Sequence, residues 1–256
     1  METIKPSQNS PIGIFDSGLG GLTVLKSLET ILPNESFIYF GDTAHVPYGT
    51  KSAETVIRYS QHIMDFFQKH ETKAVVIACN TASAVAFQHL KQSYDIPLFD
   101  VVTPSVEFAI NHTKNKNIGV VGTFSTIYSN AYTKMFQKLG SGCNVKEIAC
   151  PLFVPIIEEG WANTDIAESV VKTYLNEFQN INIDTLILGC THYPIMVNTI
   201  QKVLSNQINL VYSGKTVGIK LKEHLKKQNC ENSSLSSQPA KYFVTDFPQK
   251  FDELGG

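Results

Sequence analysis

The sequence predicts an α/β protein built from two pseudo-symmetric three-layer α/β domains with mainly parallel sheets, with the active site in the cleft between them. Short runs that are apolar on both faces alternate with segments of helical periodicity, as is typical of parallel strands covered by helices on each side. Related sequence recurs about 110 residues later in the chain. Glycine-rich and polar segments follow several predicted strands, where open parallel sheets bind their ligands.

The elements follow from the spacing of apolar residues. Runs of four to six apolar, often β-branched residues, bounded by Gly, Pro, Asn or Asp, predict strands. These runs are Ile12–Phe15, Phe37–Phe40, Ala74–Ala78, Pro97–Val102, Ile118–Val121, Val145–Ala149, Thr185–Leu188, Ile208–Tyr212 and Tyr242–Thr245. Apolar residues three or four apart predict helices between them. These segments are Leu22–Leu32, Ala53–Gln68, Ser83–Gln92, Ser105–Asn111, Ile127–Leu139, Asp165–Phe178, Ile195–Leu204 and Val217–Lys227. Residues 229–240 are expected to form a loop.

The internal repeat predicts two related half-molecules. Residues 74–81, Ala-Val-Val-Ile-Ala-Cys-Asn-Thr, are similar to residues 185–192, Thr-Leu-Ile-Leu-Gly-Cys-Thr-His. In each, a strand is followed by a cysteine and then by a polar pair that opens a helix. The turn at residues 41–47 aligns with residues 149–155 at nearly the same offset. Each half is long enough to form a domain.

Composition excludes several classes of protein. With 21 Lys and Arg against 23 Asp and Glu, the net charge of −2 argues against a nucleic-acid-binding surface. No run of about 18 apolar residues predicts a membrane span, and the polar start lacks the apolar segment of a signal peptide. The five cysteines are odd in number and form no Cys-x-x-Cys pair. We therefore expect a cytoplasmic protein without a disulfide framework or a metal site.

A glycine-rich turn, Asp16-Ser-Gly-Leu-Gly-Gly21, follows the first predicted strand. It is not a dinucleotide fingerprint, because Thr23 stands where the third glycine is required, and it lacks the Gly-Lys-Ser/Thr of a P-loop. Two interpretations remain. The glycines serve a tight turn, or backbone N–H groups at the helix start bind a carboxylate, with Asp16 and Ser17 facing the ligand.

Cys79 and Cys190 are the candidate catalytic residues. Each ends an apolar strand, adjoins the start of the next predicted helix and is followed by polar residues. Most free cysteines are buried packing residues, but a helix N-terminus stabilises a thiolate by roughly 0.3–2 kcal/mol. We therefore expect the pKa of these thiols to fall towards about 7, which suits a general base. Cys143, Cys150 and Cys230 lack this setting and are assigned no catalytic role.

Two thiols facing one cleft are compatible with three chemistries. They form a redox disulfide, or one of them acts with a histidine in acyl transfer. In the third, one thiolate removes a proton from a carbon atom and the opposite thiol returns a proton to the other face. That reaction inverts a stereocentre and needs no cofactor.

Six motifs follow predicted strands or the turns between them. They are Asp16-Ser-Gly-Leu-Gly-Gly-Leu-Thr, Gly41-Asp-Thr-Ala-His-Val-Pro-Tyr-Gly, Ala78-Cys-Asn-Thr-Ala-Ser, Val121-Gly-Thr, Cys150-Pro-Leu-Phe-Val-Pro-Ile-Ile-Glu-Glu-Gly and Leu188-Gly-Cys-Thr-His-Tyr-Pro. Together they resemble the glutamate racemases of the aspartate/glutamate racemase superfamily. The resemblance implies cofactor-independent interconversion of L-glutamate and D-glutamate, which supplies D-glutamate for peptidoglycan. It also implies a homodimer.

The resemblance assigns roles to particular residues. Cys79 would be the base on D-glutamate, assisted by Asp16, and Cys190 the base on L-glutamate, assisted by Glu158 and His192. The residues expected to contact substrate are Asp16, Ser17, Pro47, Tyr48, Gly49, Thr50, Asn80, Thr81, Thr123, Thr191 and His192. By the same resemblance, residues 1–102 with 214–256 would form the first domain, and residues 103–213 the second.

Three other functions stay open at this stage. The chain is a racemase of aspartate or another acidic amino acid, a Cys-dependent amidase, or a module that binds glutamate without turning it over. A substrate panel separates the first from glutamate racemisation. An amidase would release ammonia and tolerate the loss of one cysteine, and a binding module would leave the α-proton of glutamate unexchanged.

Overall fold

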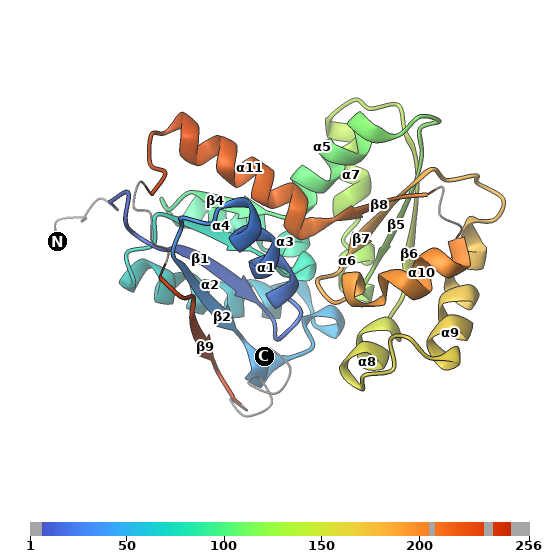
Figure 1. Cartoon of the computed structure of the whole chain (residues 1–256), viewed down its shortest axis with the longest axis horizontal. Coiled ribbons are helices and arrows are strands. Elements are labelled where there is room, and N and C mark those ends of the chain that lie inside the picture. Colours follow the sequence, from blue (N-terminus) through green and yellow to red (C-terminus); the bar gives the residue numbers. More distant parts are fainter. Residues whose placement is uncertain (1–6, 205–207, 233–237, 247–256) are drawn as a thin grey trace.

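Two parallel β-sheets form the frame of the protein (Figure 1). The computed structural model describes residues 7–204, 208–232 and 238–246. The strands of the first sheet are β1 (Ile12–Asp16), β2 (Phe37–Gly41), β3 (Ala74–Ile77), β4 (Leu98–Asp100) and β9 (Lys241–Val244). The strands of the second are β5 (Asn117–Gly122), β6 (Asn144–Ala149), β7 (Thr185–Gly189) and β8 (Asn209–Tyr212). Every predicted strand is present, so the α/β prediction is confirmed.

Helices connect the strands. They are α1 (Leu22–Ile31), α2 (Ala53–Lys69), α3 (Asn80–Val85), α4 (Phe87–Ser93), α5 (Val102–His112), α6 (Phe124–Tyr128), α7 (Ala131–Lys138), α8 (Phe153–Glu158), α9 (Asp165–Leu175), α10 (Val197–Leu204) and α11 (Ser213–Lys227). Short 3-10 helices lie at Thr43–His45, Tyr48–Thr50, Asn176–Phe178 and Tyr193–Met196. None of the helices in these described ranges is both long and apolar enough to cross a membrane.

The strand orders show the predicted repeat directly. The first sheet runs β4-β3-β1-β2-β9 and the second β6-β5-β7-β8, with all neighbours parallel. Read backwards, the second order is β8-β7-β5-β6, which matches β4-β3-β1-β2 strand for strand. Cys79 and Cys190 follow the corresponding strands β3 and β7. The two halves therefore share one topology, and β9 is added to the first.

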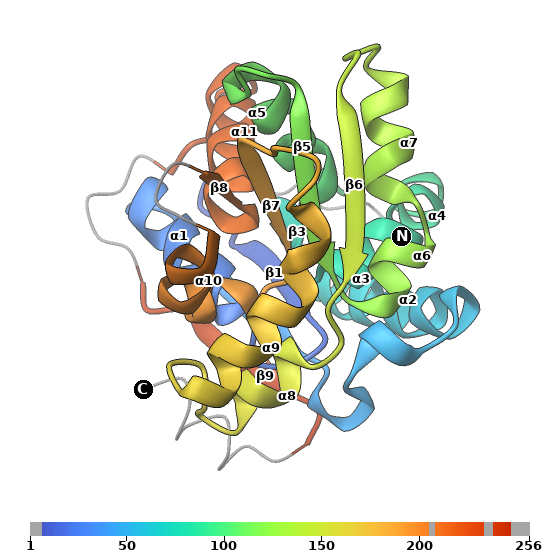
Figure 2. The same ribbon diagram turned by 90° about the vertical axis from the view of Figure 1, so that its right-hand side faces the viewer.

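Each sheet is covered on both faces. One face of the first sheet packs on α1 and α11, and the other packs on α2, α3 and α4. The second sheet packs on α8, α9 and α10 on one face and on α5 and α7 on the other. Figure 2 shows α10 and α7 on opposite sides of the second sheet. Burial on both faces explains the continuously apolar strands.

Helix α11 joins the two halves, packing on α1 of the first and on α5 and β8 of the second (Figure 1). Its close approach to α1 requires glycine at two positions. A Cβ atom on Gly214 would lie 2.7 Å from the Ser27 hydroxyl, and one on Gly218 would lie 2.6 Å from Ile31. We propose the domain boundaries expected above, at 102/103 and 213/214, and the membership of the two sheets supports them. Residues 1–6, 205–207, 247–256 and, within the predicted loop, 233–237 lie outside the described residues.

Two predicted helices are interrupted. The expected helix Ser83–Gln92 begins earlier, at Asn80 directly after Cys79, and breaks between α3 and α4 at Ala86. The expected helix Ile127–Leu139 is divided into α6 and α7, because Asn130 adopts a left-handed conformation with φ of 55°. Asparagine is one of the few residues that tolerate this conformation. Apolar spacing continues across both breaks and therefore could not predict them.

Candidate active site

The carboxyl ends of β3 and β7 bring Cys79 and Cys190 to one cavity between the two halves. The cavity has a volume of about 200 Å³, below the roughly 300–1,000 Å³ of sites for drug-sized ligands. Of the predicted site residues, these line it: Ser17, Pro47, Tyr48, Gly49, Thr50, Cys79, Asn80, Thr81, Thr123, Glu158, Cys190, Thr191 and His192. The structure thus gathers residues from six sequence motifs around a space that suits a small molecule.

Asp16 is the one predicted site residue that does not line the cavity. It is fully buried behind the wall, where its carboxylate accepts hydrogen bonds from the Gly18 N–H at 3.0 Å and the Thr191 hydroxyl at 3.3 Å. Burial raises the pKa of Asp16, and the positive charge of His192 partly offsets this rise. In this structure Asp16 therefore acts on the cavity only indirectly, through the residues to which it is hydrogen-bonded.

The glycine-rich turn holds these groups by close packing. A Cβ atom on Gly21 would lie 2.4 Å from the Asp16 side chain, and one on Gly20 would lie 2.4 Å from Nδ1 of His192. The Gly18 N–H is already used by Asp16. These contacts favour the close-turn interpretation of the glycines over direct binding of a carboxylate.

Burial favours the neutral thiol at Cys79. Cys79 lies at the start of α3, is 5% exposed, and its Sγ donates to the Ser17 hydroxyl at 3.8 Å. Burial, followed by the negative charge of Asp16, raises the pKa of Cys79 to about 12. The expected fall of this pKa towards about 7 was wrong: a backbone hydrogen bond from Ala82 in α3 does lower the pKa, but burial and the charge of Asp16 outweigh it.

Cys190 has a different neighbourhood. No α-helix starts beside it: the 3-10 helix Tyr193–Met196 comes first and α10 begins at Val197, so that part of the prediction was wrong. Instead, its Sγ lies 3.8 Å from Nδ1 of His192, whose Nε2 lies 3.1 Å from Oε1 of Glu158. Glu158, His192 and Cys190 therefore form a chain that ends at the cavity.

His192 is an imidazolium at neutral pH. Burial lowers its pKa, but hydrogen bonds to Cys190 and Glu158, together with the negative charges of Cys190 and Asp16, raise it to about 10. In that form both ring nitrogens donate, one towards the sulfur and one to the carboxylate. The imidazolium thus lies between the sulfur of Cys190 and the carboxylate of Glu158.

Polar side chains connect the halves beside the cysteines. The hydroxyls of Thr81, Thr123 and Thr126 lie 2.9–3.2 Å apart in a closed ring. The side-chain nitrogen of Asn80 donates to the Tyr132 hydroxyl at 2.8 Å and to the Ser213 hydroxyl at 3.1 Å. Both N–H groups of Asn80 are thus used, whereas its buried Oδ1 has no partner among the described residues. This oxygen suits a donor such as an ammonium group better than a carboxylate.

Apolar residues complete the wall, and the sequence reasoning did not select them. They are Val46, Phe124, Pro151, Val154 and Pro155. Three of them stand in the motif that begins at Cys150, and the other two adjoin predicted substrate contacts. Their position in these motifs was the signal that could have identified them. They exclude water from the thiols, which strengthens the charge interactions inside the cavity.

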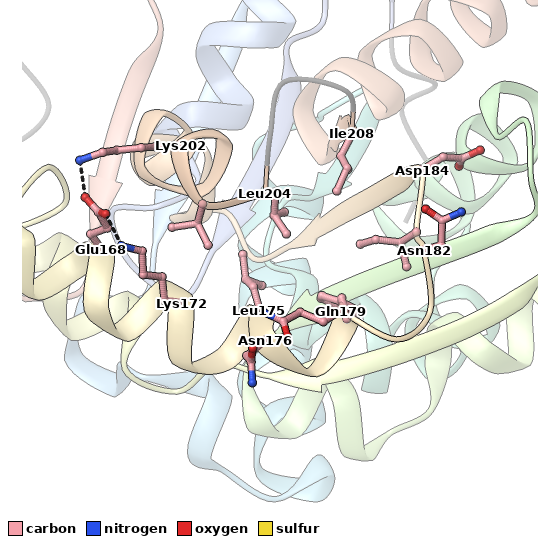
Figure 3. A pocket seen from close by; sticks show the side chains of 13 residues that line it. Glu168, Lys172, Leu175, Asn176, Gln179, Asn182, Asp184, Lys202, Leu204 and Ile208 are labelled. Atoms are coloured by element: carbon pink, nitrogen blue, oxygen red, sulfur yellow. Dashed lines mark hydrogen bonds and ion pairs between the residues drawn. The ribbon is translucent and has the colours of Figure 1, made fainter.

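A second, larger cavity is a weaker candidate. It has a volume of about 740 Å³ and lies between α9 and α10 (Figure 3). The residues described around it include no cysteine or histidine. Its charged side chains already have partners: Glu168 binds both Lys172 and Lys202, and the Asp184 carboxylate accepts hydrogen bonds from the Thr113 hydroxyl and the Lys114 N–H. Within residues 7–204, 208–232 and 238–246, no three or more His, Cys, Asp and Glu side chains are grouped to hold a metal ion.

Comparison with known proteins places the chain in a family. The family model described as "Asp/Glu/Hydantoin racemase" matches residues 12–220. The chain belongs to this family. It is 44% identical to glutamate racemase of Chlorobaculum parvum over 255 residues, which are 99% of this chain and 94% of that protein. The predicted family is therefore confirmed.

Solved structures agree with this assignment. Glutamate racemase isoform RacE1 from Bacillus anthracis is 35% identical and superposes with a TM-score of 0.93, covering 96% of this chain and 92% of that one. Glutamate racemase from Francisella tularensis in complex with D-glutamate is 42% identical, with a TM-score of 0.90 over 97% of this chain and 92% of that one. The two-sheet architecture is therefore that of glutamate racemases.

The charge of Asp16 predicts a measurable effect on Cys79. Asp16→Asn removes the negative charge that helps to raise the pKa of Cys79. A nearby like charge shifts a pKa by about one unit or more, so we expect iodoacetamide to alkylate Cys79 about tenfold faster in this variant at fixed pH. Peptide mass spectrometry measures the rate at Cys79 alone. Asp100→Asn, another buried carboxylate at a strand end, should leave the rate unchanged. An unchanged or slower rate in Asp16→Asn would contradict the assignment.

Proposed function

We propose that this chain interconverts L-glutamate and D-glutamate without a cofactor, by two-base transfer of the α-proton, and supplies D-glutamate for peptidoglycan. The observation that carries the proposal is the placement of Cys79 and Cys190, which follow corresponding strands of the two halves and line one small cavity. The identity of more than 40% to glutamate racemases over nearly the whole chain supports glutamate as the substrate.

In the proposed reaction of D-glutamate, the Cys79 thiolate removes the α-proton and becomes a thiol. The electron pair of the broken C–H bond stays on the α-carbon. The Cys190 thiol then donates its proton to the opposite face, forming a new C–H bond and leaving Cys190 as the thiolate. The reaction of L-glutamate runs through the same steps in reverse. One thiol and one thiolate are present at each end of the reaction, so protons and charge balance.

The charged neighbours of the two thiols differ. The His192 imidazolium faces Cys190 at 3.8 Å and would stabilise the thiolate that forms there. Glu158 holds the imidazolium from its other nitrogen. On the Cys79 side, Asp16 would assist through Thr191, to which it is hydrogen-bonded. Its negative charge opposes a thiolate at Cys79 and would favour the substrate ammonium group.

Neutral donors would bind the two carboxylates of glutamate. The hydroxyls of Ser17, Thr50, Thr81, Thr123 and Thr191 line the cavity, as does the backbone of the loop from Pro47 to Thr50. Several such donors can bind a carboxylate without an opposing cation, because hydrogen bonds to a charged acceptor are the stronger ones. Pro47, Tyr48, Gly49 and Asn80 complete the proposed substrate contacts.

The experiment that tests the function follows the circular dichroism of L-glutamate and, separately, D-glutamate in D₂O. We expect each to lose its signal as the racemic mixture forms and to gain deuterium at the α-carbon. If neither enantiomer inverts or exchanges, the proposal fails. A parallel panel with aspartate tests the nearest alternative, ammonia release tests for an amidase, and binding without exchange would indicate a binding module.

We also propose a homodimer. Three apolar side chains beside the cavity support it, since Val46 and Phe124 line the cavity and are 42% and 48% exposed. Tyr128 is 70% exposed and stacks on Phe124 with ring centroids 4.1 Å apart. Contiguous exposed apolar surface often marks a protein interface. Light scattering should give twice the chain mass of 28.4 kDa for the wild type and a lower mass for Tyr128→Glu. A wild-type mass of 28.4 kDa would contradict the dimer.

A further inference from the structure

A buried carboxylate lies under the loop that carries Pro47–Thr50 to the cavity. Asp42 is 3% exposed and immediately follows β2. Its Oδ2 accepts a hydrogen bond from the Tyr48 hydroxyl at 2.5 Å. Its Oδ1 lies 2.8 Å from Nδ1 of His45 and accepts a hydrogen bond from the Thr245 hydroxyl at 2.9 Å. Asp42 therefore binds two residues of the loop, His45 and Tyr48, and a residue about 200 positions further along the chain.

That distant residue stands at the end of β9, which runs beside β2 with Val244 opposite Gly41. The Thr245 N–H donates to the Gly41 carbonyl at 3.2 Å, and the Thr245 hydroxyl accepts from the Ala44 N–H at 2.9 Å. The Asp246 N–H donates to the Thr43 hydroxyl at 2.8 Å, and this hydroxyl donates to the Asp246 carbonyl. The end of β9 is thus bound along the first residues of the loop.

The loop is held from other sides as well. The ring of Tyr59 stacks on His45, with centroids 4.1 Å apart, and lies 5.9 Å from the ring of Tyr48. A Cβ atom on Gly49 would lie 2.7 Å from Thr123, so the loop backbone touches the opposite half. A small displacement of Tyr48 would therefore change the width of the cavity between Gly49 and Thr123.

We propose that Asp42 and Thr245 are positioning residues for this loop, so that the C-terminal strand β9 sets the affinity of the active site for its substrate. Neither side chain is among those that line the cavity, and both act through Tyr48 and the backbone of residues 43–50. The inference rests on the proposed function for its substrate, glutamate. Its structural part is independent of that assignment.

The expected effect is on KM rather than kcat. The loop supplies neither of the two proposed bases, so we expect its contacts to bind the ground state and the transition state equally. Loss of such uniform binding raises KM and leaves kcat unchanged. A general folding defect has the opposite signature, because it lowers the amount of active enzyme, and hence the apparent kcat, at an unchanged KM.

Thr245→Val gives the sharpest test, because Thr245 is exposed and the substitution removes only the hydroxyl. We expect KM to rise about 5- to 10-fold for both enantiomers, with kcat within about twofold of the wild type. Thr245→Ser keeps the hydroxyl and should restore the wild-type KM. Thr199→Val is a matched control, since its hydroxyl donates to the Ala162 carbonyl at 2.7 Å far from the loop. It should lower the melting temperature without changing KM.

Two further measurements separate the possible failures. Asp42→Asn should raise KM more than Thr245→Val, because one carboxylate serves three partners. Hydrogen exchange of the amides in residues 43–50 should be faster in Thr245→Val than in the wild type, whether or not glutamate is the substrate. If the wild type does not racemise glutamate but exchange is still faster in Thr245→Val, the proposed function is refuted and the positioning proposal is not. Unchanged KM and unchanged exchange in Thr245→Val would overturn the positioning proposal.

Discussion

Replacing either Cys79 or Cys190 by alanine is expected to reduce the racemisation of glutamate by at least about 10³-fold. Each thiol faces the cavity from a different half of the chain, so neither can reach the face of the α-carbon that the other serves. Inversion needs a base on one face and an acid on the other. Each single variant therefore loses a step that no other described residue around the cavity is placed to supply.

Isotope exchange distinguishes the two roles. In Cys79→Ala, Cys190 remains as the base for L-glutamate, so L-glutamate in D₂O should gain α-deuterium without inverting. Cys190→Ala should show the same exchange with retention for D-glutamate only. Nuclear magnetic resonance of the α-proton, combined with chiral chromatography, measures both outcomes. Exchange of the same enantiomer in both variants would refute the assignment of the bases.

Cys143→Ala is the matched control, since Cys143 is a half-buried cysteine that does not line the cavity. It should racemise glutamate at the wild-type rate. Wild-type turnover in Cys79→Ala or Cys190→Ala would contradict the two-base scheme and favour chemistry that needs one cysteine.

Replacing His192 by glutamine is expected to lower kcat/KM by about 10²-fold. The imidazolium is the nearest positive charge to Cys190, at 3.8 Å, and glutamine keeps the polarity but not the charge. The Cys190 thiolate would then face a cavity whose described lining residues include no lysine or arginine. Steady-state kinetics in both directions measure the loss, and binding of D-glutamate by calorimetry shows whether the site is still intact.

The pH dependence provides an independent test of the same pair. The pKa of His192, about 10, lies above its ordinary value, so the charge is present at neutral pH and is lost as the pH rises through about 10. Glu158 contributes to that rise, so Glu158→Gln should lower the pKa of His192 and move the alkaline loss of activity to lower pH. The substrate amine titrates equally in all variants, and the shift therefore belongs to the enzyme. If activity is lost over the same alkaline pH range in the wild type and in Glu158→Gln, this role of His192 and Glu158 is contradicted.

The sequence predicted the architecture well, because strand and helix periodicity are properties of neighbouring residues and the repeat is visible when two segments of the sequence are compared. The same strand order in both halves follows from that repeat. Residues in strand-end motifs, such as Thr81 and Thr123, also come together as predicted, because parallel strands direct their carboxyl ends to one edge.

What the sequence could not predict depends on contacts between distant segments. The pKa of Cys79 depends on how completely the closed cavity removes water, and the helix start alone suggested the opposite direction. The position of Asp16 behind the cavity wall depends in part on its hydrogen bond with Thr191, which lies 175 residues further along the chain. The link between Asp42 and Thr245 spans 203 residues; Asp42 stands in one of the six sequence motifs, but no local pattern pairs it with Thr245.

The two thiols have unequal surroundings, with a carboxylate near Cys79 and an imidazolium beside Cys190. The substrate and product of the proposed reaction are mirror images with equal free energies in water, so the equilibrium constant is one. Thermodynamics then requires kcat/KM to be identical in the two directions, whatever the electrostatics of each wall. The different surroundings of the two thiols can therefore change kcat and KM between the enantiomers only by the same factor. The enantiomer with the lower KM then also has the lower kcat. The asymmetric site therefore sets which enantiomer saturates the enzyme first, while the ratio of the products stays fixed.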